Sequence, residues 1–116
     1  MSGQPLKSVH IPSFYYDTML PLLHAHEWKV LSCVLVYTYA TRINLPALTF
    51  GELTKRSGMA RGKLTKALRD LAYHNIVIES QGTFALQAPA DFYMDKLVER
   101  SQHELAARKQ FAKGGR

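Results

Sequence analysis

Residues 49–86 constrain the fold more than any other part of the chain, because the spacing of their apolar residues changes along the segment. As far as His74 these residues recur every three or four positions, which is typical of amphipathic helices. Beyond it, the short segments 76–79 and 83–86 predict two strands around a tight turn at residues 80–82. The order short helix, turn, helix and hairpin predicts a mainly α-helical domain with a small β-hairpin, of class α+β.

The ends of the two helices are marked by local signals. Thr49 and Glu52 have the spacing of a capping box, which predicts a short helix from residue 50 or 51 to Ser57. Gly58 can end this helix, since glycine adopts a positive φ without steric cost. A second helix is predicted over residues 61–74, and Asn75 can end it in a left-handed conformation.

The flanking segments predict further elements. Residues 1–12 are expected to form an extended arm, and Ser13 to cap a short helix that is bent at Pro21. The strongest helical periodicity covers residues 26–41, whose wide apolar face predicts the central helix of the core. Residues 48–50 are consistent with a one-ladder strand.

The C-terminal part predicts one more helix. Asp91 is expected to cap it, and it should run to about Ala112 with a thin apolar stripe. The predicted organisation is therefore an arm at 1–12, a domain at 13–88, and a helix with a basic tail at 89–116. That last segment would serve packing, dimerisation or a tether to a further domain.

Composition narrows the class of protein. A chain of 116 residues with 47% hydrophobic residues suffices for one modest core. No apolar run approaches the roughly 18 residues that span a bilayer, so no membrane partner is expected. The N-terminus lacks the apolar stretch of a signal peptide, and the single Cys33 fits a reducing compartment, so a cytoplasmic location is predicted.

The charge is unevenly distributed. The net charge is +6, which favours polyanionic partners. From Leu53 to Arg69 there is no acidic residue, and the cations in this stretch are Lys55, Arg56, Arg61, Lys63, Lys66 and Arg69.

These residues carry a resemblance to a known family. Residues 49–71, TFGELTKRSGMARGKLTKALRDL, resemble a winged helix-turn-helix, and the following NIVIES and TFALQ resemble its wing. Upstream, residues 9–40 resemble the N-terminal DNA-binding domain of phage and plasmid replication initiators of the lambda O-like type. The resemblance implies double-stranded DNA as the partner, helix 61–74 in the major groove, and a role in binding a replication origin.

The chain departs from the family pattern at three places. Ala60 stands where a capping serine is usual, and Gly62 replaces a small hydroxylated residue in the first turn of the second helix. Gly62 would let the backbone approach DNA closely. The wing turn carries no lysine or arginine, and Gln81 is its one long polar side chain.

By motif position, Arg61, Lys63 and Thr65 are expected at base edges or adjacent phosphates, while Lys66 and Arg69 are expected at phosphates. The sequence does not distinguish which residue faces a base. The full predicted DNA-binding set is Thr49, Lys55, Arg56, Arg61, Gly62, Lys63, Thr65, Lys66, Arg69 and Gln81.

Two other functions stay open. One is a free-standing transcriptional regulator or partition adaptor that forms a homodimer through the last helix. The other is a winged helix that binds a replication or transcription protein and does not touch DNA. No catalytic motif is present, so neither an enzyme nor a cofactor is expected. His24 and His26 would not share a helix face, so no metal site is expected.

Overall fold

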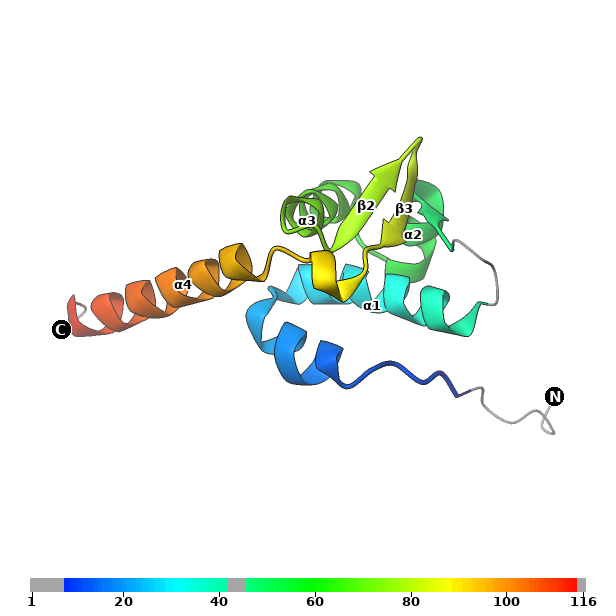
Figure 1. The fold of residues 1–116 in the computed structure, drawn as a ribbon. Coiled ribbons are helices and arrows are strands. Elements are labelled where there is room, and N and C mark those ends of the chain that lie inside the picture. Colours follow the sequence, from blue (N-terminus) through cyan, green and yellow to red (C-terminus); the bar gives the residue numbers. More distant parts are fainter. Residues whose placement is uncertain (1–7, 42–45, 115–116) are drawn as a thin grey trace, which may run out of the picture.

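The computed structural model describes residues 8–41 and 46–114, with side chains as far as Lys109. It is mainly helical with a small antiparallel sheet, which confirms the predicted α+β class (Figure 1). In chain order the elements are η1 (Tyr15–Met19), η2 (Leu20–Leu22), α1 (Ala25–Ala40), β1 (Leu48–Thr49), α2 (Phe50–Ser57), α3 (Arg61–Tyr73), β2 (Val77–Ser80), β3 (Thr83–Leu86), η3 (Pro89–Asp91) and α4 (Met94–Gly114).

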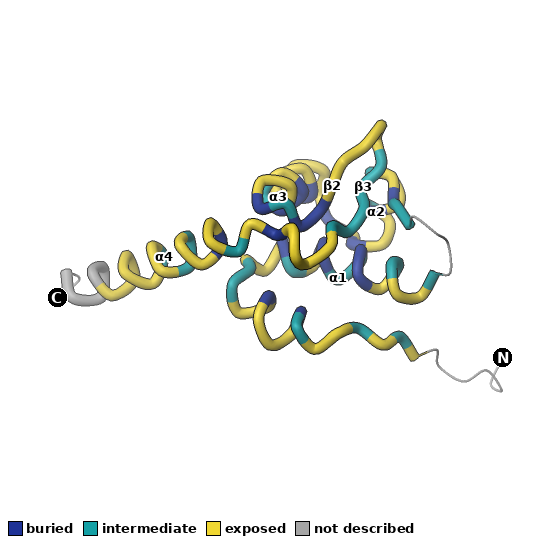
Figure 2. Tube along the Cα trace, in the orientation of Figure 1, coloured by how far each residue is buried: buried dark blue, intermediate teal, exposed yellow. Residues whose placement is uncertain are grey.

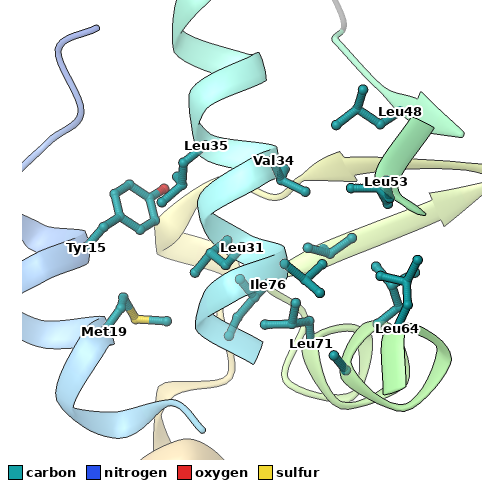
Figure 3. Close-up of a cluster of buried hydrophobic side chains, with 14 of the residues drawn as sticks. Tyr15, Met19, Leu31, Val34, Leu35, Leu48, Leu53, Leu64, Leu71 and Ile76 are labelled. Carbon is teal, nitrogen blue, oxygen red and sulfur yellow. The ribbon is translucent and has the colours of Figure 1, made fainter. Parts of the chain in front are cut away.

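Helix α1 is the central element of the core, as its periodicity predicted. It contacts α2, α3 and β3, so its apolar face is covered by three elements. Figure 3 shows Leu31, Val34 and Leu35 of α1 among buried side chains of the surrounding elements. The fully buried residues packed around them include Tyr15, Met19, Leu48, Leu53, Leu64, Leu71, Ile76 and Leu97.

The predicted helix ends are confirmed by their hydrogen bonds and backbone angles. The Glu52 backbone N–H donates to the Thr49 hydroxyl at 3.1 Å, and the Thr49 N–H donates to the Glu52 carboxylate at 2.8 Å. These bonds lower the pKa of Glu52. Gly58 ends α2 with φ of 66°, and Asn75 follows α3 with φ of 58°. Both residues adopt the left-handed conformation that ends a helix.

The sheet has the strand order β1-β3-β2. The predicted hairpin is present, and β1 pairs with its second strand, β3, through Leu48 opposite Phe84, so that β3 is the central strand of the sheet. The turn is shorter than expected, since Ser80 already belongs to β2 and only Gln81 and Gly82 connect the strands. Both have positive φ, 51° and 81°, which is the geometry of a two-residue hairpin turn.

The N-terminal helix differs from the prediction. Residues 13–23 form a π-helical turn followed by a 3-10 turn that contains Pro21, so the expected bend is present. The expected side-chain cap is wrong, because Ser13 contributes its backbone carbonyl, which accepts from the N–H groups of Tyr16 and Asp17 at 2.9 and 2.8 Å. Residues 8–12 of the predicted arm contain no helix or strand, and residues 1–7 lie outside the described part of the chain.

The start of α4 also differs from the prediction. Asp91 does not cap it, because Asp91 closes the 3-10 turn η3 and α4 begins at Met94. The Asp91 carbonyl instead accepts from the Asn75 side chain at 2.7 Å. Phe92 and Leu97 are buried in the main core, so the first turns of α4 pack with the segment 13–88. The side chains of Ala112 and Lys113, in the predicted stripe and tail, lie outside the described residues.

Helix α4 leaves the rest of the molecule after these turns. Its 21 residues correspond to about 32 Å of helix, most of which projects away from the core (Figure 1). Figure 2 shows that the projecting part is largely exposed. Val98 and Leu105, which belong to the predicted stripe, are 38% and 51% exposed.

Two side-chain contacts join α4 to the start of α1. One is exposed, between a His24 ring nitrogen and the Glu104 carboxylate at 2.7 Å, and the other is a largely buried ion pair between Arg100 and Glu27. Arg100 donates two hydrogen bonds of 2.7 Å to Glu27, which is only 2% exposed, and a third of 3.1 Å to the carbonyl of Leu22. Burial by itself raises the pKa of Glu27, but the bonds from Arg100 and from the His24 backbone outweigh it, and the net shift is downward. The Glu27 carboxylate is therefore charged and satisfied in the folded protein.

No helix within residues 8–41 and 46–114 is both long and apolar enough to cross a bilayer. Nor does that part of the chain bring three histidine, cysteine, aspartate or glutamate side chains into a group that could hold a metal ion.

Candidate nucleic-acid interface

Helix α3 is held in the core by one face only. Its buried residues recur at three- and four-residue intervals: Leu64, Ala67, Leu68 and Leu71. With 3.6 residues per turn, the line opposite this face passes through Gly62, Lys66, Arg69 and Tyr73. All four are exposed. We call this line the α3 ridge.

The turn between α2 and α3 is held by the core. Leu53 of α2 and Leu64 and Leu68 of α3 are buried together, as predicted. Met59 in the turn is also buried, and its N–H donates to the Ser57 hydroxyl at 3.2 Å. The position of the α3 ridge is therefore set by apolar packing on both sides of Gly58.

Lys66 lies in the middle of the ridge and has an acidic neighbour. Its ammonium group is 3.0 Å from the Asp70 carboxylate one turn along α3. The Lys66 side chain is 71% exposed, and exposed pairs of this spacing contribute about 0.3–0.5 kcal/mol. Such a weak pair can be exchanged for a contact with an external anion. Arg69 belongs to no ion pair within the described part of the chain.

Arg61, Lys63 and Thr65, which were predicted at base edges or adjacent phosphates, do not all share one face. The Arg61 guanidinium lies 5.9 Å from the centre of the Phe50 ring, toward α2. Lys63 lies on the opposite flank of α3 and lines a small hollow with His24 and His26. Thr65 lies on the hairpin side, where it lines another hollow. Lys63 points away from the other two because residues two apart on a helix point about 200° apart, whereas Arg61 and Thr65 are four apart and lie on the same flank, beside Phe50.

The remaining predicted residues lie outside α3. The Arg56 guanidinium lies 4.9 Å from the centre of the Tyr37 ring, against α1. Lys55 is exposed on the outer face of α2. Thr49 is used by the α2 cap, and Gln81 is exposed at the tip of the hairpin. The structure therefore brings together Gly62, Lys66 and Arg69, with Thr65 and Arg61 on the adjoining flank, and places the other predicted residues elsewhere.

Gly62 is not required by packing within the chain. A β-carbon at this position would meet no atom within 4 Å, and Gly62 has no positive φ. Its backbone is exposed in the first turn of α3, where Ala60 supplies no side-chain cap. A glycine there costs about 0.5–1 kcal/mol of helix stability relative to alanine.

A hollow of about 410 Å³ lies between α3 and the hairpin. Phe50, Leu68 and Phe84 supply its apolar part. Thr65 and Arg69 line it from α3, and Glu79 lines it from β2. Glu79 gives the hairpin a negative charge beside the ridge, which is the wrong sign for a second contact with a polyanion.

Sequence reasoning missed Tyr73, which extends the ridge beyond Arg69 and is 61% exposed. The signal was available, because Tyr73 follows Arg69 by four positions, the spacing of neighbours on one helix face. It also missed Lys96 of α4, whose ammonium group lies 4.6 Å from the centre of the Tyr73 ring.

Comparison with protein-family models, with curated proteins and with solved structures found no match to this chain. The family resemblance therefore stays a prediction from the sequence.

Proposed function

We propose that the chain is a double-stranded DNA-binding protein whose winged helix-turn-helix places α3 in the major groove. The single observation that carries the proposal is the α3 ridge. It presents a glycine and two cations on a helix whose opposite face is fixed in the core. The major groove is about 12 Å wide and admits one such helix.

The position of each residue on α3 indicates whether it would contact a base edge or a phosphate in the groove. The most outward residues of an inserted helix reach the base edges, so Lys66 and Arg69, with Thr65 beside them, take that role. Residues on the two flanks point toward the two phosphate backbones, which suits Arg61 on one flank and Lys63 on the other. For Lys66 and Arg69 this differs from the phosphate contacts expected from motif position, while phosphate contacts for Arg61 and Lys63 and a base edge for Thr65 are among the expected roles. An arginine paired with guanine contributes about 1–3 kcal/mol of discrimination.

Within this class, we propose the origin-binding module of a phage or plasmid replication initiator. The support is the resemblance of residues 9–40 to that family. Selection of bound duplexes from a random pool, mapped onto the source genome, tests this. Clustered repeats at an origin support it, and scattered sites in promoters contradict it.

Fluorescence anisotropy with a mixed-sequence duplex tests DNA binding itself. The double variant Lys66→Ala/Arg69→Ala should bind much more weakly than the unaltered protein at low salt. Each lost phosphate-facing cation also reduces the slope of log K against log salt by about 0.9. A base-facing cation affects the slope less and the sequence preference more, so the size of the slope change separates the two roles.

Lys29→Ala is the matched control. Lys29 is exposed on α1 opposite the buried Val30, Leu31, Val34 and Leu35, the face on which α3 packs. Removing this charge should leave affinity and slope nearly unchanged. If the double variant behaves like Lys29→Ala, α3 is not the DNA-binding element.

A second candidate is a winged helix that binds a protein partner. The hairpin tip carries no cation, Glu79 is acidic, and the hollow beside it has an apolar floor of Phe50 and Phe84. Retention of a replication or transcription protein without any shift of duplex DNA favours this candidate.

A third candidate keeps the DNA face and adds a homodimer through α4. Val98 and Leu105 are exposed and seven residues apart, so they lie on one face of the helix. Sedimentation of the full chain and of Leu105→Glu tests it. A dimer that the substitution dissociates supports a dimeric regulator or adaptor, and a monomer in both cases contradicts it.

A further inference from the structure

A cluster of one lysine and two tyrosines lies where α3 and α4 meet. The Lys96 ammonium group of α4 is 4.6 Å from the centre of the Tyr73 ring and 5.1 Å from the centre of the Tyr93 ring. Both tyrosines are about half exposed, at 61% and 48%. Contacts of this kind contribute about 0.5–1 kcal/mol at exposed sites, so the rings orient the lysine without burying its charge.

The cluster continues the α3 ridge. Tyr73 is the last residue of α3 and follows Gly62, Lys66 and Arg69 on the outward line. Lys96 forms no ion pair within the described part of the chain. Its charge is therefore available to an external anion at the end of the helix that is proposed to enter the groove.

A hollow of about 450 Å³ joins the ridge to the cluster. Lys66 and Tyr73 line it from α3, and Lys96 lines it from α4. Asp70 and Glu99 also line it, but Asp70 is already paired with Lys66. Two lysines from different helices thus converge on one opening beside the ridge.

We propose that Tyr73, Lys96 and Tyr93 bind a backbone phosphate of double-stranded DNA, next to the segment that α3 reads. This inference rests on the proposed function. A helix that crosses the major groove meets a phosphate backbone at the end of its path, and a tyrosine hydroxyl and a lysine ammonium group both donate hydrogen bonds to phosphate oxygens. Helix α4 would then add an anchor to DNA that the helix-turn-helix alone lacks.

The test measures affinity for a mixed-sequence duplex of about 20 base pairs over a range of salt concentrations, with Lys96→Met as the key variant. Methionine keeps an unbranched chain against the two rings and removes the charge. Lys96→Met should lower affinity at low salt by about fivefold and reduce the salt slope by about one, the loss of one phosphate contact. Lys96→Arg should restore most of the loss, and Tyr73→Phe should weaken binding by a smaller factor.

Lys29→Met is the matched control for Lys96→Met, because it removes one positive charge outside the proposed DNA-binding face. If Lys96→Met matches Lys29→Met in affinity and slope while Lys66→Ala/Arg69→Ala weakens binding, the phosphate site is overturned and the proposed function stands. If the unaltered protein does not bind the duplex, the proposed function itself fails. Unchanged thermal melting of each variant excludes unfolding as the cause of a loss.

Discussion

Helices α3 and α4 both carry exposed cations, but they differ in how firmly they are held. Four residues of α3, spread over its length, are buried in the core. Helix α4 buries Leu97 in the core, and its Arg100 is paired with Glu27 of α1. From Leu105 to Lys109 every side chain is exposed. A cationic face can recognise a groove only if its residues keep a fixed relative position. This difference supports the proposals that α3 is the DNA-reading element and that the start of α4 is an anchor.

The largest expected difference between the two helices is in their apolar residues. Leu71→Ala removes a fully buried side chain beneath α3 and should lower the free energy of unfolding by about 2–5 kcal/mol. Leu105→Ala on α4 should change it by no more than about 0.5 kcal/mol. Urea unfolding of both variants measures the two values. Equal losses would mean that the outer part of α4 is buried in solution.

Loss of the ion pair that fixes α4 should have the next largest effect. Arg100→Ala leaves the buried Glu27 carboxylate without its main partner and should cost about 3 kcal/mol. Arg108→Ala is the matched control, since Arg108 is exposed on the same helix. If the two variants have the same unfolding midpoint in urea, the pair does not hold α4 to α1.

The same pair should make stability depend on pH. Because the pKa of Glu27 is lowered in the folded protein, its contribution is complete above the unfolded-state pKa, near 4.5, and is lost as pH falls through the lower folded value. The stability difference between the unaltered protein and Glu27→Gln should shrink between about pH 6 and pH 3. A difference that is constant over this range would show that the carboxylate is not preferentially charged in the fold.

The smallest effect concerns Gly62 and separates stability from binding. Gly62→Ala should raise the free energy of unfolding by about 0.5–1 kcal/mol, since the added β-carbon has open space. The same change should weaken binding to duplex DNA if the backbone of the first turn approaches the groove. A more stable variant with unaltered affinity would show that Gly62 does not lie against DNA.

Much of the fold could be predicted from the sequence because the ends of its helices are determined by residues at or next to those ends. Thr49 with Glu52, Gly58 and Asn75 each determine a helix end through their own backbone or side-chain chemistry. The cap of α4 at Asp91 was predicted wrongly because a competing 3-10 turn at Pro89–Asp91 delays the start of the helix to Met94. A cap residue shows that a helix can start there, not that it does.

The candidate site was less predictable because it depends on the directions in which side chains leave α3 and on contacts between residues that are far apart in the sequence. The separation of Arg61 from Lys63 follows from helical geometry and could have been inferred. The pairing of Glu27 with Arg100 could not, since 73 residues separate them and each alone is an ordinary surface charge. The meeting of Tyr73 with Lys96 likewise depends on where α4 leaves the core.

The proposed function requires that the outward face of α3 contacts duplex DNA. Titration of the ¹⁵N-labelled protein with a duplex, followed by amide resonances, tests it most directly. The largest shifts should fall on the exposed positions from Gly62 to Tyr73, while the resonances of the outer face of α1 around Lys29 should stay unchanged. Shifts confined to α1 and η1, or no shift at low salt, would contradict it.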